Sequence, residues 1–348
     1  MNSSSPTLTQ KPSVSLVIPG RNCAKTLEKC LDSVVPFLEQ GGLQEILFVD
    51  DGSTDNTAEI ARRYPVQVIT GTGSGPGAAR NLGWRQAQGE YIWFIDSDCV
   101  AEPDALQKLI PHLDNPEVAG VGGSYANLYP DSLLATLIHE EIIARHRRMP
   151  QDVNFLATFN VIYRQQVLEE VGGFDETLKL AQDAELAFRI VQAGYQLRFE
   201  IDSRVGHHHP RQLSRYLRTQ ARQGYYRVLL YRLHPGRMRG DSYAGISDYA
   251  QPPLAALSFA ALPTCFVSGG WLVSTTLTML LILLQIPVTV SLTQQAGRRM
   301  LIFPAFGCLR AYFRAAGMVV GACSQKQRAS KKHSSGLVVK CCKYMGDQ

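Results

Sequence analysis

Two carboxylates one residue apart, Asp96 and Asp98, follow the apolar run Tyr91–Ile95. Such a run predicts a buried β-strand, and an open α/β sheet binds its ligands at the carboxyl ends of its strands. Carboxylate oxygens are the ligands that Mg²⁺ and Mn²⁺ prefer, and a divalent ion held there could bind a diphosphate. Most isolated Asp-x-Asp pairs are solvated turn residues, so the interpretation depends on the residues before and after this pair.

A second acidic segment, Asp50–Asp55, follows the predicted strand Gln44–Val49. Ser53 or Asp55 can cap the helix that comes next, which would explain part of the segment without any ligand. A carboxylate at a strand end can also accept a hydrogen bond from the ring N–H of a pyrimidine, or bind a ribose hydroxyl. The two roles are compatible, and the sequence leaves both open.

The elements that position these carboxylates alternate between strand and helix. Apolar, β-branched runs predict the strands, and apolar residues at helical spacing predict the helices. The alternation predicts an α/β fold with a parallel, doubly wound sheet, and three polar strand ends on one edge favour a nucleotide site. The predicted strands are 14–18, 44–49, 66–70 and 91–95, and the predicted helices are 24–38, 57–64 and 77–87.

The glycine-rich stretch Gly73–Asn81 superficially matches the dinucleotide fingerprint G-x-G-x-x-A. That fingerprint belongs after the first strand of its βαβ unit, whereas this stretch follows the third predicted strand. Pro76 also removes a backbone donor from the loop that would hold a pyrophosphate. An oxidoreductase that binds a dinucleotide is therefore disfavoured.

Charge divides the 348 residues, whose formal net charge is +5, into three zones. A mixed-charge α/β region comes first, Ser203–Gly240 then holds nine arginines and no acidic residue, and Tyr249–Gly297 holds no charge. The polar N-terminus lacks the apolar core of a signal peptide, which favours the cytoplasm for the α/β region. Eight scattered cysteines without a C-x-x-C pair indicate neither a zinc site nor a disulfide framework. We expect a disordered N-terminus (1–13), a catalytic domain (14–240), a membrane region (241–323) and a basic disordered tail (324–348).

A basic stripe is predicted where Arg211, Arg215, Arg218 and Arg222 recur at helical spacing. A solvated helix face would explain it. The alternative is a helix against anionic lipid headgroups or a diphosphate, and the apolar region that follows favours the membrane. Nucleic acid is not expected as a partner, because aromatic platforms and a nucleic-acid-binding motif are missing.

The charge-free region is long enough for two membrane spans of roughly 20 residues each. The predicted spans are 254–271 and 273–292, joined by a tight turn near Gly269 and Gly270. Arginines flank the region on both sides, which requires an even number of spans if both ends face the cytoplasm. One longer span and a buried soluble hairpin are the alternatives.

The segment 300–321 is apolar but carries Arg310 and Arg314 one helical turn apart. A third span would bury both charges in lipid at a cost of several kcal/mol. We therefore expect an interfacial helix whose arginines lie at the headgroups.

Seven segments with separate signals follow one another along the chain: Val14–Asn22, Asp50–Asp55, Gly75–Gly83, Asp96–Asp98, Asn160–Arg164, Val171–Glu176 and Gln182–Arg189. Together they resemble the family 2 glycosyltransferases, inverting enzymes of the GT-A fold. The resemblance covers roughly residues 13 to 230. It implies a GT-A-type nucleotide-binding sheet with flanking helices, a nucleotide-sugar donor and a divalent metal, Mg²⁺ or Mn²⁺.

The resemblance implies a role for each residue of the nucleotide site. Pro19, Arg21 and Asn22 would border the base and ribose of the donor. Asp51 would read a uracil ring, which favours UDP over GDP, and Arg80 would lie near the donor phosphates.

The resemblance also implies the two acidic sites that an inverting displacement needs. Asp98 would be the direct metal ligand, with Asp96 on the ribose or, through water, on the metal. Asp183 matches the catalytic base that takes the proton from the acceptor hydroxyl, while a metal compensates the charge of the departing diphosphate. The common Glu-Asp of this motif is Gln182-Asp183 here, and Glu185 is the second candidate base.

One of His207–His209 could complete the Asp98 site or contact phosphate, with a polar loop near the site as the alternative. Processive synthases of the family carry Gln-x-x-Arg-Trp, and Gln220–Arg227 does not match it, which favours a single transfer. We expect an inverting glycosyltransferase that moves a sugar from a nucleotide-sugar to a lipid or lipid-linked glycan at the cytoplasmic membrane face. A catalytically inactive member that binds nucleotide-sugar or scaffolds a glycan synthesis complex is the alternative.

Overall fold

The computed structural model of the protein describes residues 12–266 and 268–343, so the predicted disordered N-terminus lies almost wholly outside it. The chain forms two compact units that divide after His209, not at residue 240 as the sequence suggests. The arginine-rich helix that follows His209 packs on the C-terminal helix, where Arg314 Nε donates to Gln220 Oε1 at 2.7 Å. This packing assigns the arginine-rich segment to the second unit.

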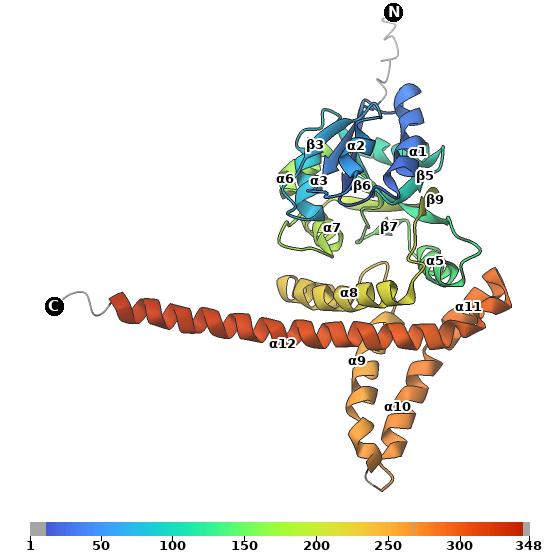
Figure 1. The fold of residues 1–348 in the computed structure, drawn as a ribbon, viewed down its shortest axis with the longest axis vertical. Helices are drawn as coiled ribbons and strands as arrows, with labels where there is room; N and C mark the ends of the chain where they lie inside the picture. The colour runs from blue at the N-terminus through green and yellow to red at the C-terminus, as the bar shows by residue number, and fades with distance from the viewer. Residues whose placement is uncertain (1–11, 267, 344–348) are drawn as a thin grey trace, which may run out of the picture. The chain divides into compact units, whose positions relative to one another are not determined.

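The first half of the sheet in unit 1 (Figure 1) is parallel, as the alternation of strands and helices predicts, and its strand order is β3-β2-β1-β4. Short helices connect the strands, so the polar residues after each strand reach one edge. The strands are β1 (Val14–Gly20), β2 (Glu45–Asp50), β3 (Gln67–Thr70) and β4 (Tyr91–Ile95), and the helices are α1 (Leu27–Glu39), α2 (Thr57–Ala61) and α3 (Pro76–Trp84).

The sheet as a whole is mixed, because the strands after β4 do not continue the parallel arrangement predicted for the first four. β8 (Asn160–Arg164) lies antiparallel to β4, and β6 (Val118–Asn127), β9 (Gln196–His207) and β5 (Cys99–Ala101) follow in that order. The regular alternation on which the prediction rested ends after β4, so nothing local required the later strands to be parallel. β7 (Asp152–Val153) pairs with β9, and the remaining helices of the unit are α4 (Ala105–Leu109), η1 (Ile110–Asp114), α5 (Leu133–His146), α6 (Gln165–Val171) and α7 (Gln182–Gln192).

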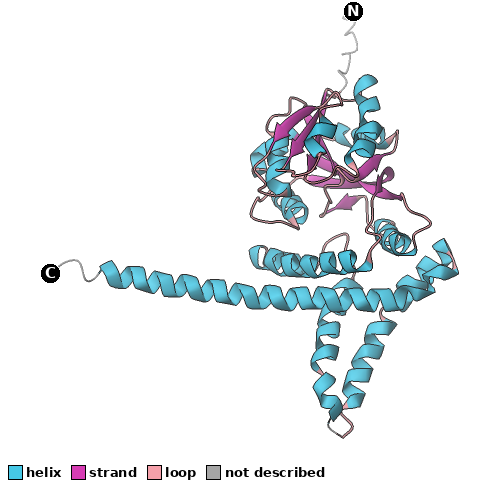
Figure 2. Ribbon diagram, viewed as in Figure 1, coloured by secondary structure: helices cyan, strands magenta, loops and turns pink. Residues whose placement is uncertain are grey.

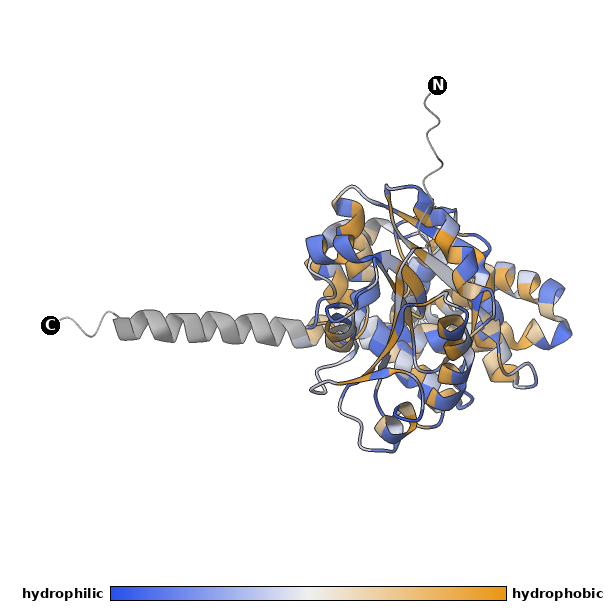
Figure 3. Ribbon diagram, turned by 90° about the horizontal axis from the view of Figure 1, so that it is seen from above, coloured by the Kyte–Doolittle hydropathy of each residue, from blue (hydrophilic) through white to orange (hydrophobic). Residues whose placement is uncertain are grey.

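Both faces of the sheet are buried, because successive strand residues point to opposite sides. Trp93 packs in the cluster that contains the apolar residues of α1, and its neighbour Phe94 packs in the cluster on the other face with Ala79 of α3. Apolar residues follow the strands in Figure 3. Helix α3 approaches the sheet closely at Gly83, where an added Cβ would meet Val17 Cγ1 at 2.4 Å. The rigid core thus holds the strand ends in place.

Unit 2 is helical (Figure 2). The predicted turn at Gly269 and Gly270 is present, but the first predicted span is interrupted after Ala260, because Pro263 disfavours helical backbone before it. Within the described residues, one stretch is long and apolar enough to cross a membrane, Trp271–Ala296, with a mean hydropathy of 1.9. The helices are α8 (Leu213–Leu233), η2 (Pro235–Arg239), α9 (Ile246–Ala260), η3 (Leu262–Phe266), α10 (Trp271–Leu283), α11 (Ile286–Ala296), η4 (Arg298–Ile302) and α12 (Phe303–Lys343).

The predicted interfacial helix 300–321 falls within η4 and α12. The sequence suggests a disordered tail from residue 324, whereas α12 continues to Lys343. Proline is absent from α12 after Pro304, so no residue of the type that breaks helices most strongly occurs there. Residues 344–348 lie outside the described part of the chain.

Candidate active site

The ends of β1, β2 and β4 bring the predicted nucleotide-binding residues to one edge of the sheet. Gly20 is paired with Asp50 in the parallel register of β1 and β2, and Asp51 N donates to Gly20 O at 2.8 Å. Pro19 lies one residue earlier and is buried within β1. The Asp51 side chain is buried too, and its Oδ2 accepts a hydrogen bond from Gly75 N at 2.8 Å. Asp51 therefore holds the glycine-rich loop against the end of β2.

The loops after β1 and β2 are tied together by Asn22. Its Oδ1 accepts from Thr54 N at 2.7 Å, and its N donates to Ser53 Oγ at 2.9 Å. Asn22 has a φ of 51°, a left-handed conformation that asparagine tolerates better than most residues. Arg21 is exposed, and its Nη1 lies 3.5 Å from Gly73 O. Both residues therefore border the space in front of the strand ends.

The helix cap that the sequence left open is made by Asp55. Its Oδ1 accepts from Thr57 N at 3.1 Å and from Thr57 Oγ1 at 2.5 Å, and the second of these bonds is the main cause of its lowered pKa. Ser53 instead bonds to Asn22 and to Asp50, whose Oδ1 accepts from Ser53 N at 2.9 Å. Capping therefore accounts for Asp55 and does not involve Asp51.

Arg80 and Asp96 form an ion pair, with Arg80 Nη2 2.5 Å from Asp96 Oδ1. The Arg80 side chain is 4% exposed and that of Asp96 is 33% exposed. Arg80 Nε and Nη1 are buried and find no hydrogen-bond partner among the described residues. Unpaired buried donors cost free energy, so the guanidinium is suited to an anionic ligand beside Asp96.

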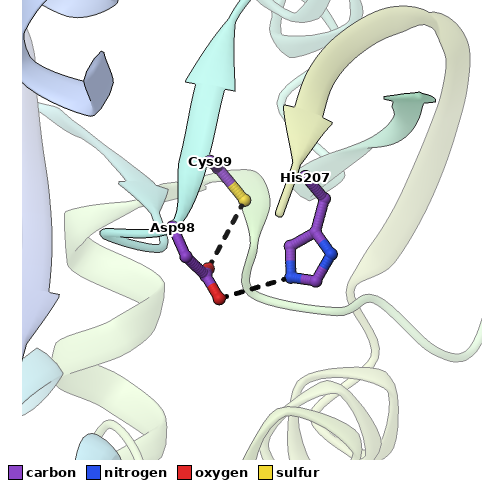
Figure 4. A group of neighbouring side chains, drawn as sticks. All are labelled: Asp98, Cys99 and His207. Atoms are coloured by element: carbon purple, nitrogen blue, oxygen red, sulfur yellow. Dashed lines mark hydrogen bonds and ion pairs between the residues drawn. The ribbon is translucent and has the colours of Figure 1, made fainter. Parts of the chain in front are cut away.

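Asp98 lies beside His207 (Figure 4). The antiparallel pairing of β5 with β9 places Cys99 opposite His207, and His207 Nε2 then lies 3.5 Å from Asp98 Oδ2. Partial burial by itself would raise the pKa of Asp98, but the positive charge of His207 and their hydrogen bond bring it below its ordinary value. Conversely, burial alone would lower the pKa of His207, and Asp98 raises it above its ordinary value. Of the three consecutive histidines, His207 is the one whose side chain pairs with Asp98.

The three residues Asp98, Cys99 and His207 have potential ligand atoms within 4.8 Å of one another. A carboxylate oxygen with an imidazole nitrogen suits Mn²⁺ and related divalent ions. Cys99 is fully buried, and its soft sulfur is not a ligand that Mn²⁺ or Mg²⁺ prefers. The Asp98 side chain is 45% exposed, which leaves open positions for a ligand. These residues fit a divalent ion held by Asp98 and His207.

The other two histidines face elsewhere. The His208 ring contacts Tyr129 and hydrogen-bonds its hydroxyl. His209 is buried, and its Nδ1 lies 2.9 Å from His207 Nδ1. His209 therefore packs against the His207 ring and helps to hold it in position.

Asp183 lies in the first turn of α7, after Ala181, whose φ of 65° turns the chain into the helix. Its Oδ1 accepts a hydrogen bond from Ala184 N at 2.8 Å. Tyr163 on β8 is fully buried, and its pKa is raised first by burial and then by the charge of Asp183, while Arg80 lowers it. Asp183 and Arg80 thus both lie within electrostatic reach of Tyr163.

Glu185, the second candidate base, is held in an ion pair with Arg189. Arg189 Nε donates to Glu185 Oε1 at 2.7 Å, and Arg189 Nη2 donates to Oε2 at 2.6 Å. The same guanidinium also donates to the carbonyls of Val171 and Gly173. Since Glu185 is buried in this network, Asp183 is the better placed carboxylate for proton transfer.

Asn81, which the sequence marked only as part of a motif, clamps the segment before α7. Its Nδ2 donates to Phe174 O, and its Oδ1 accepts from Phe174 N, both at 2.8 Å. Trp84 Nε1 donates to the same Oδ1 at 2.9 Å. The clamp ties α3 to the loop that leads toward Asp183, and no local pattern in the sequence indicates it.

A pocket of about 250 Å³ lies where β6, α5 and β9 meet, and the sequence contains no motif for it. Tyr125 lines the pocket, and its ring centroid lies 5.0 Å from that of His207. His139, also in the lining, is buried, and its Nδ1 has no hydrogen-bond partner among the described residues. The pocket therefore lies one aromatic ring away from the candidate metal site, with a polar group available to a ligand.

Known proteins resemble this chain in sequence. Residues 15–172 match the family model of Glycosyl transferase family 2. Glycosyltransferase AglE of Haloferax volcanii is 32% identical over 222 residues, which cover 61% of this chain and 72% of the relative. The pre-mycofactocin glycosyltransferase of Mycobacterium tuberculosis is 29% identical over 222 residues, and there the match spans only 46% of the relative.

A solved structure resembles the fold. It is the mannosyltransferase PcManGT from Pyrobaculum calidifontis in complex with GDP-Man and Mn²⁺, with 20% identity and a TM-score of 0.59. The superposition covers 90% of this chain and 88% of the mannosyltransferase. This likeness supports a GT-A-like fold, a mixed α/β sheet with flanking helices. The sequence matches show that the chain belongs to glycosyl transferase family 2.

Proposed function

We propose that this glycosyltransferase is an inverting, metal-dependent enzyme that transfers one sugar from a UDP-sugar to a lipid or lipid-linked glycan at the cytoplasmic membrane face. The observation that carries the proposal is the pairing of Asp98 with His207 at the edge where Asp51 and Arg80 also lie. A nucleotide-sugar site requires a pair of metal ligands, a carboxylate that binds the nucleotide base and a guanidinium that binds phosphate.

The donor would extend along the edge of the sheet. Arg21 and Asn22 border one side, with Pro19 beneath them in β1 and Asp51 at the end of β2. Arg80 has two donors without a partner in the described part of the chain, and these would bind a donor phosphate. UDP is proposed over GDP because the family resemblance gives Asp51 the role of accepting the ring N–H of uracil.

Asp98 and His207 would hold the metal, Mn²⁺ or Mg²⁺. When bound, the ion supplies charge compensation on the departing diphosphate. Asp96, paired with Arg80, is placed to bind the ribose or a water of the metal. The neighbouring imidazole favours Mn²⁺, since Mg²⁺ prefers oxygen ligands alone.

Asp183 would remove the proton from the acceptor hydroxyl as that oxygen attacks the sugar carbon. One in-line displacement of this kind inverts the configuration at the carbon. Glu185 cannot easily replace it, because both of its oxygens are bound by Arg189. The pocket beside Tyr125 and His139 is the proposed place for the acceptor.

The proposal is tested by thermal shift of the full-length protein in detergent, using UDP-sugars and GDP-sugars with and without Mn²⁺. A UDP-sugar should raise the melting temperature only when Mn²⁺ is present, and Asp98→Ala should abolish that dependence. A shift from GDP-sugars alone would overturn the assignment of the donor. Slow hydrolysis of the stabilising nucleotide-sugar would exclude the catalytically inactive alternative, and its complete absence with every donor would favour that alternative.

A further inference from the structure

The helices α9, η3 and α10 form a hairpin (Figure 1), and many of its large apolar side chains are exposed. Phe259 is 67% exposed, Phe266 near the tip is 95% exposed, and Met279 on α10 is 57% exposed. Continuous exposed apolar surface of this kind marks an interaction site, since water-facing surfaces avoid it. The hairpin therefore needs an apolar partner.

The hairpin packs against α12 at its base. Ala255 and Leu281 are buried in one cluster with Ala311 and Ala315 of α12. Ser258 Oγ and Tyr312 Oη lie 2.9 Å apart at the same crossing. Only the part of the hairpin beyond these contacts is free to enter another medium.

The free part is too short to cross a bilayer. From Leu281 back to Trp271, α10 rises about 15 Å at 1.5 Å per residue. The hydrocarbon core of a bilayer is about 30 Å thick, and apolar helices of 10–14 residues are typical of re-entrant segments or buried core helices. Because the hairpin residues are exposed, the buried-core explanation fails.

The candidate span Trp271–Ala296 is divided into α10 and α11. Pro287 in the first turn of α11 has no N–H for the carbonyl of Leu283, which interrupts the helical hydrogen bonds there. The Gln285 side chain at this break is buried, and its Nε2 donates to Leu281 O at 3.2 Å. A polar, protein-covered break suits the membrane surface better than the middle of a span.

Several polar groups of the hairpin are satisfied internally. Thr264 Oγ1 donates to Gly270 O at 2.8 Å across the tip. Thr275 and Thr278 each donate to the carbonyl four residues earlier at 2.9 Å, and Ser274 Oγ donates to Ser258 O at 3.4 Å. Such pairing is what hydrocarbon surroundings require, because lipid supplies no hydrogen bonds.

Charge follows the apolar segment in the sequence. Tyr249–Gly297 contains no charged residue, and Arg298 and Arg299, both exposed, follow directly in η4. Cationic side chains that flank an apolar segment complement anionic headgroups. The occupant that these features fit is one leaflet of a phospholipid bilayer.

We propose that α9, η3 and α10 form a re-entrant wedge that enters one leaflet and returns to the same face, instead of the two spans that the sequence predicts. The wedge rests on the membrane attachment proposed above. It keeps the residues before and after the hairpin on one side, so the flanking arginines are accommodated without any crossing.

Two native cysteines test the wedge without any mutation. Cys265 lies in η3 near the tip, Cys323 lies on α12, and both thiols are exposed in the structure. Membranes that contain the full-length protein are treated with a membrane-impermeant maleimide, as right-side-out and as inverted vesicles. Labelling at each cysteine is then read by peptide mass spectrometry.

The wedge predicts that Cys323 reacts only in inverted vesicles, whereas Cys265 reacts in neither orientation until detergent is added. Reaction of Cys265 in right-side-out vesicles would overturn the wedge and restore two spans. Reaction of Cys265 together with Cys323 in inverted vesicles would show that the hairpin lies outside the lipid. Recovery of the protein without membranes would overturn both the wedge and the attachment, while the donor-binding test remains independent of either.

The depth of the hairpin tip in the bilayer can be measured by tryptophan fluorescence. The chain has three tryptophans, of which Trp84 and Trp93 are buried in unit 1, whereas Trp271 is 54% exposed at the start of α10. In vesicles of phosphatidylcholine and phosphatidylglycerol, lipids brominated near the chain ends should quench Trp271 most strongly. The variant Trp271→Phe is the control and should lose this quenching. Strongest quenching by bromine near the headgroups would contradict a tip in mid-bilayer.

Discussion

His207 Nε2 lies 3.5 Å from Asp98 Oδ2, although more than a hundred residues separate the two along the chain. Strand β9 returns antiparallel to β5 and delivers the imidazole to the carboxylate. The proposed metal site would therefore combine a carboxylate oxygen with an imidazole nitrogen. The charge of His207 lowers the pKa of Asp98, and the charge of Asp98 raises the pKa of His207.

Replacing His207 with alanine should weaken Mn²⁺ binding by roughly 10–100-fold, because the site loses its nitrogen ligand. Titration calorimetry of Mn²⁺ in the presence of UDP measures the change. His208→Ala is the matched control, since His208 faces Tyr129 and not Asp98. Equal Mn²⁺ affinity in wild type and His207→Ala would remove His207 from the metal site.

Asp183→Asn should lower kcat by about 10²–10⁴-fold, because the amide cannot accept the proton of the acceptor hydroxyl. Nucleotide-sugar binding, followed by thermal shift with Mn²⁺, should remain close to that of the wild type. Glu185→Gln is the contrasting variant, and it should lower the melting temperature because it weakens the buried pair with Arg189. Full transfer by Asp183→Asn would sink the assignment of the base.

Asn81→Ala should destabilise the protein by about 2–4 kcal/mol, because it leaves Phe174 N and O and Trp84 Nε1 without their buried partner. Thermal melting measures the loss. Asn56→Ala serves as the control, since the exposed Asn56 makes no side-chain cap bond at α2, and it should change stability by about 0.5 kcal/mol or less. Similar melting temperatures for the two variants would refute the clamp.

Stability should fall as the pH drops from 7.5 to 5, in part because of His146. Burial lowers the pKa of His146 to about 3, whereas an unfolded histidine titrates near 6.5. Between these values the unfolded chain binds more protons than the folded one, so stability decreases as the pH falls through 6.5. His146→Gln should lose less melting temperature over this range than the wild type, and parallel losses would argue against a buried neutral imidazole.

The protein should remain in the membrane fraction after a wash with 1 M salt. Salt at this concentration screens the attraction between arginines and headgroups, but it does not weaken the insertion of apolar residues such as Phe266 and Trp271. Immunoblotting of pellet and supernatant provides the measurement. Release into the supernatant would show that attachment depends on charge alone.

The sequence by itself determined the strands β1, β2, β3 and β4 and the polar residues that follow them. These features are local, because a β-branched run forms a strand wherever a core covers it, and the short connecting helices force the strands to be parallel. Parallel strands end at the same edge of a sheet, so the sequence alone placed Asp51 and Asp98 together at that edge. The family motifs added Asp183 as the candidate base.

The tertiary structure decided what depends on contacts between distant residues. It chose His207 over its two neighbours through the pairing of β5 with β9, and it withdrew Glu185 because Arg189 occupies both of its oxygens. It also made the sheet mixed, and it covered the base of the apolar hairpin with α12, so that only the part beyond these contacts is free. Strand pairing and helix crossing join residues far apart in the chain, and periodicity within a single segment contains no information about them.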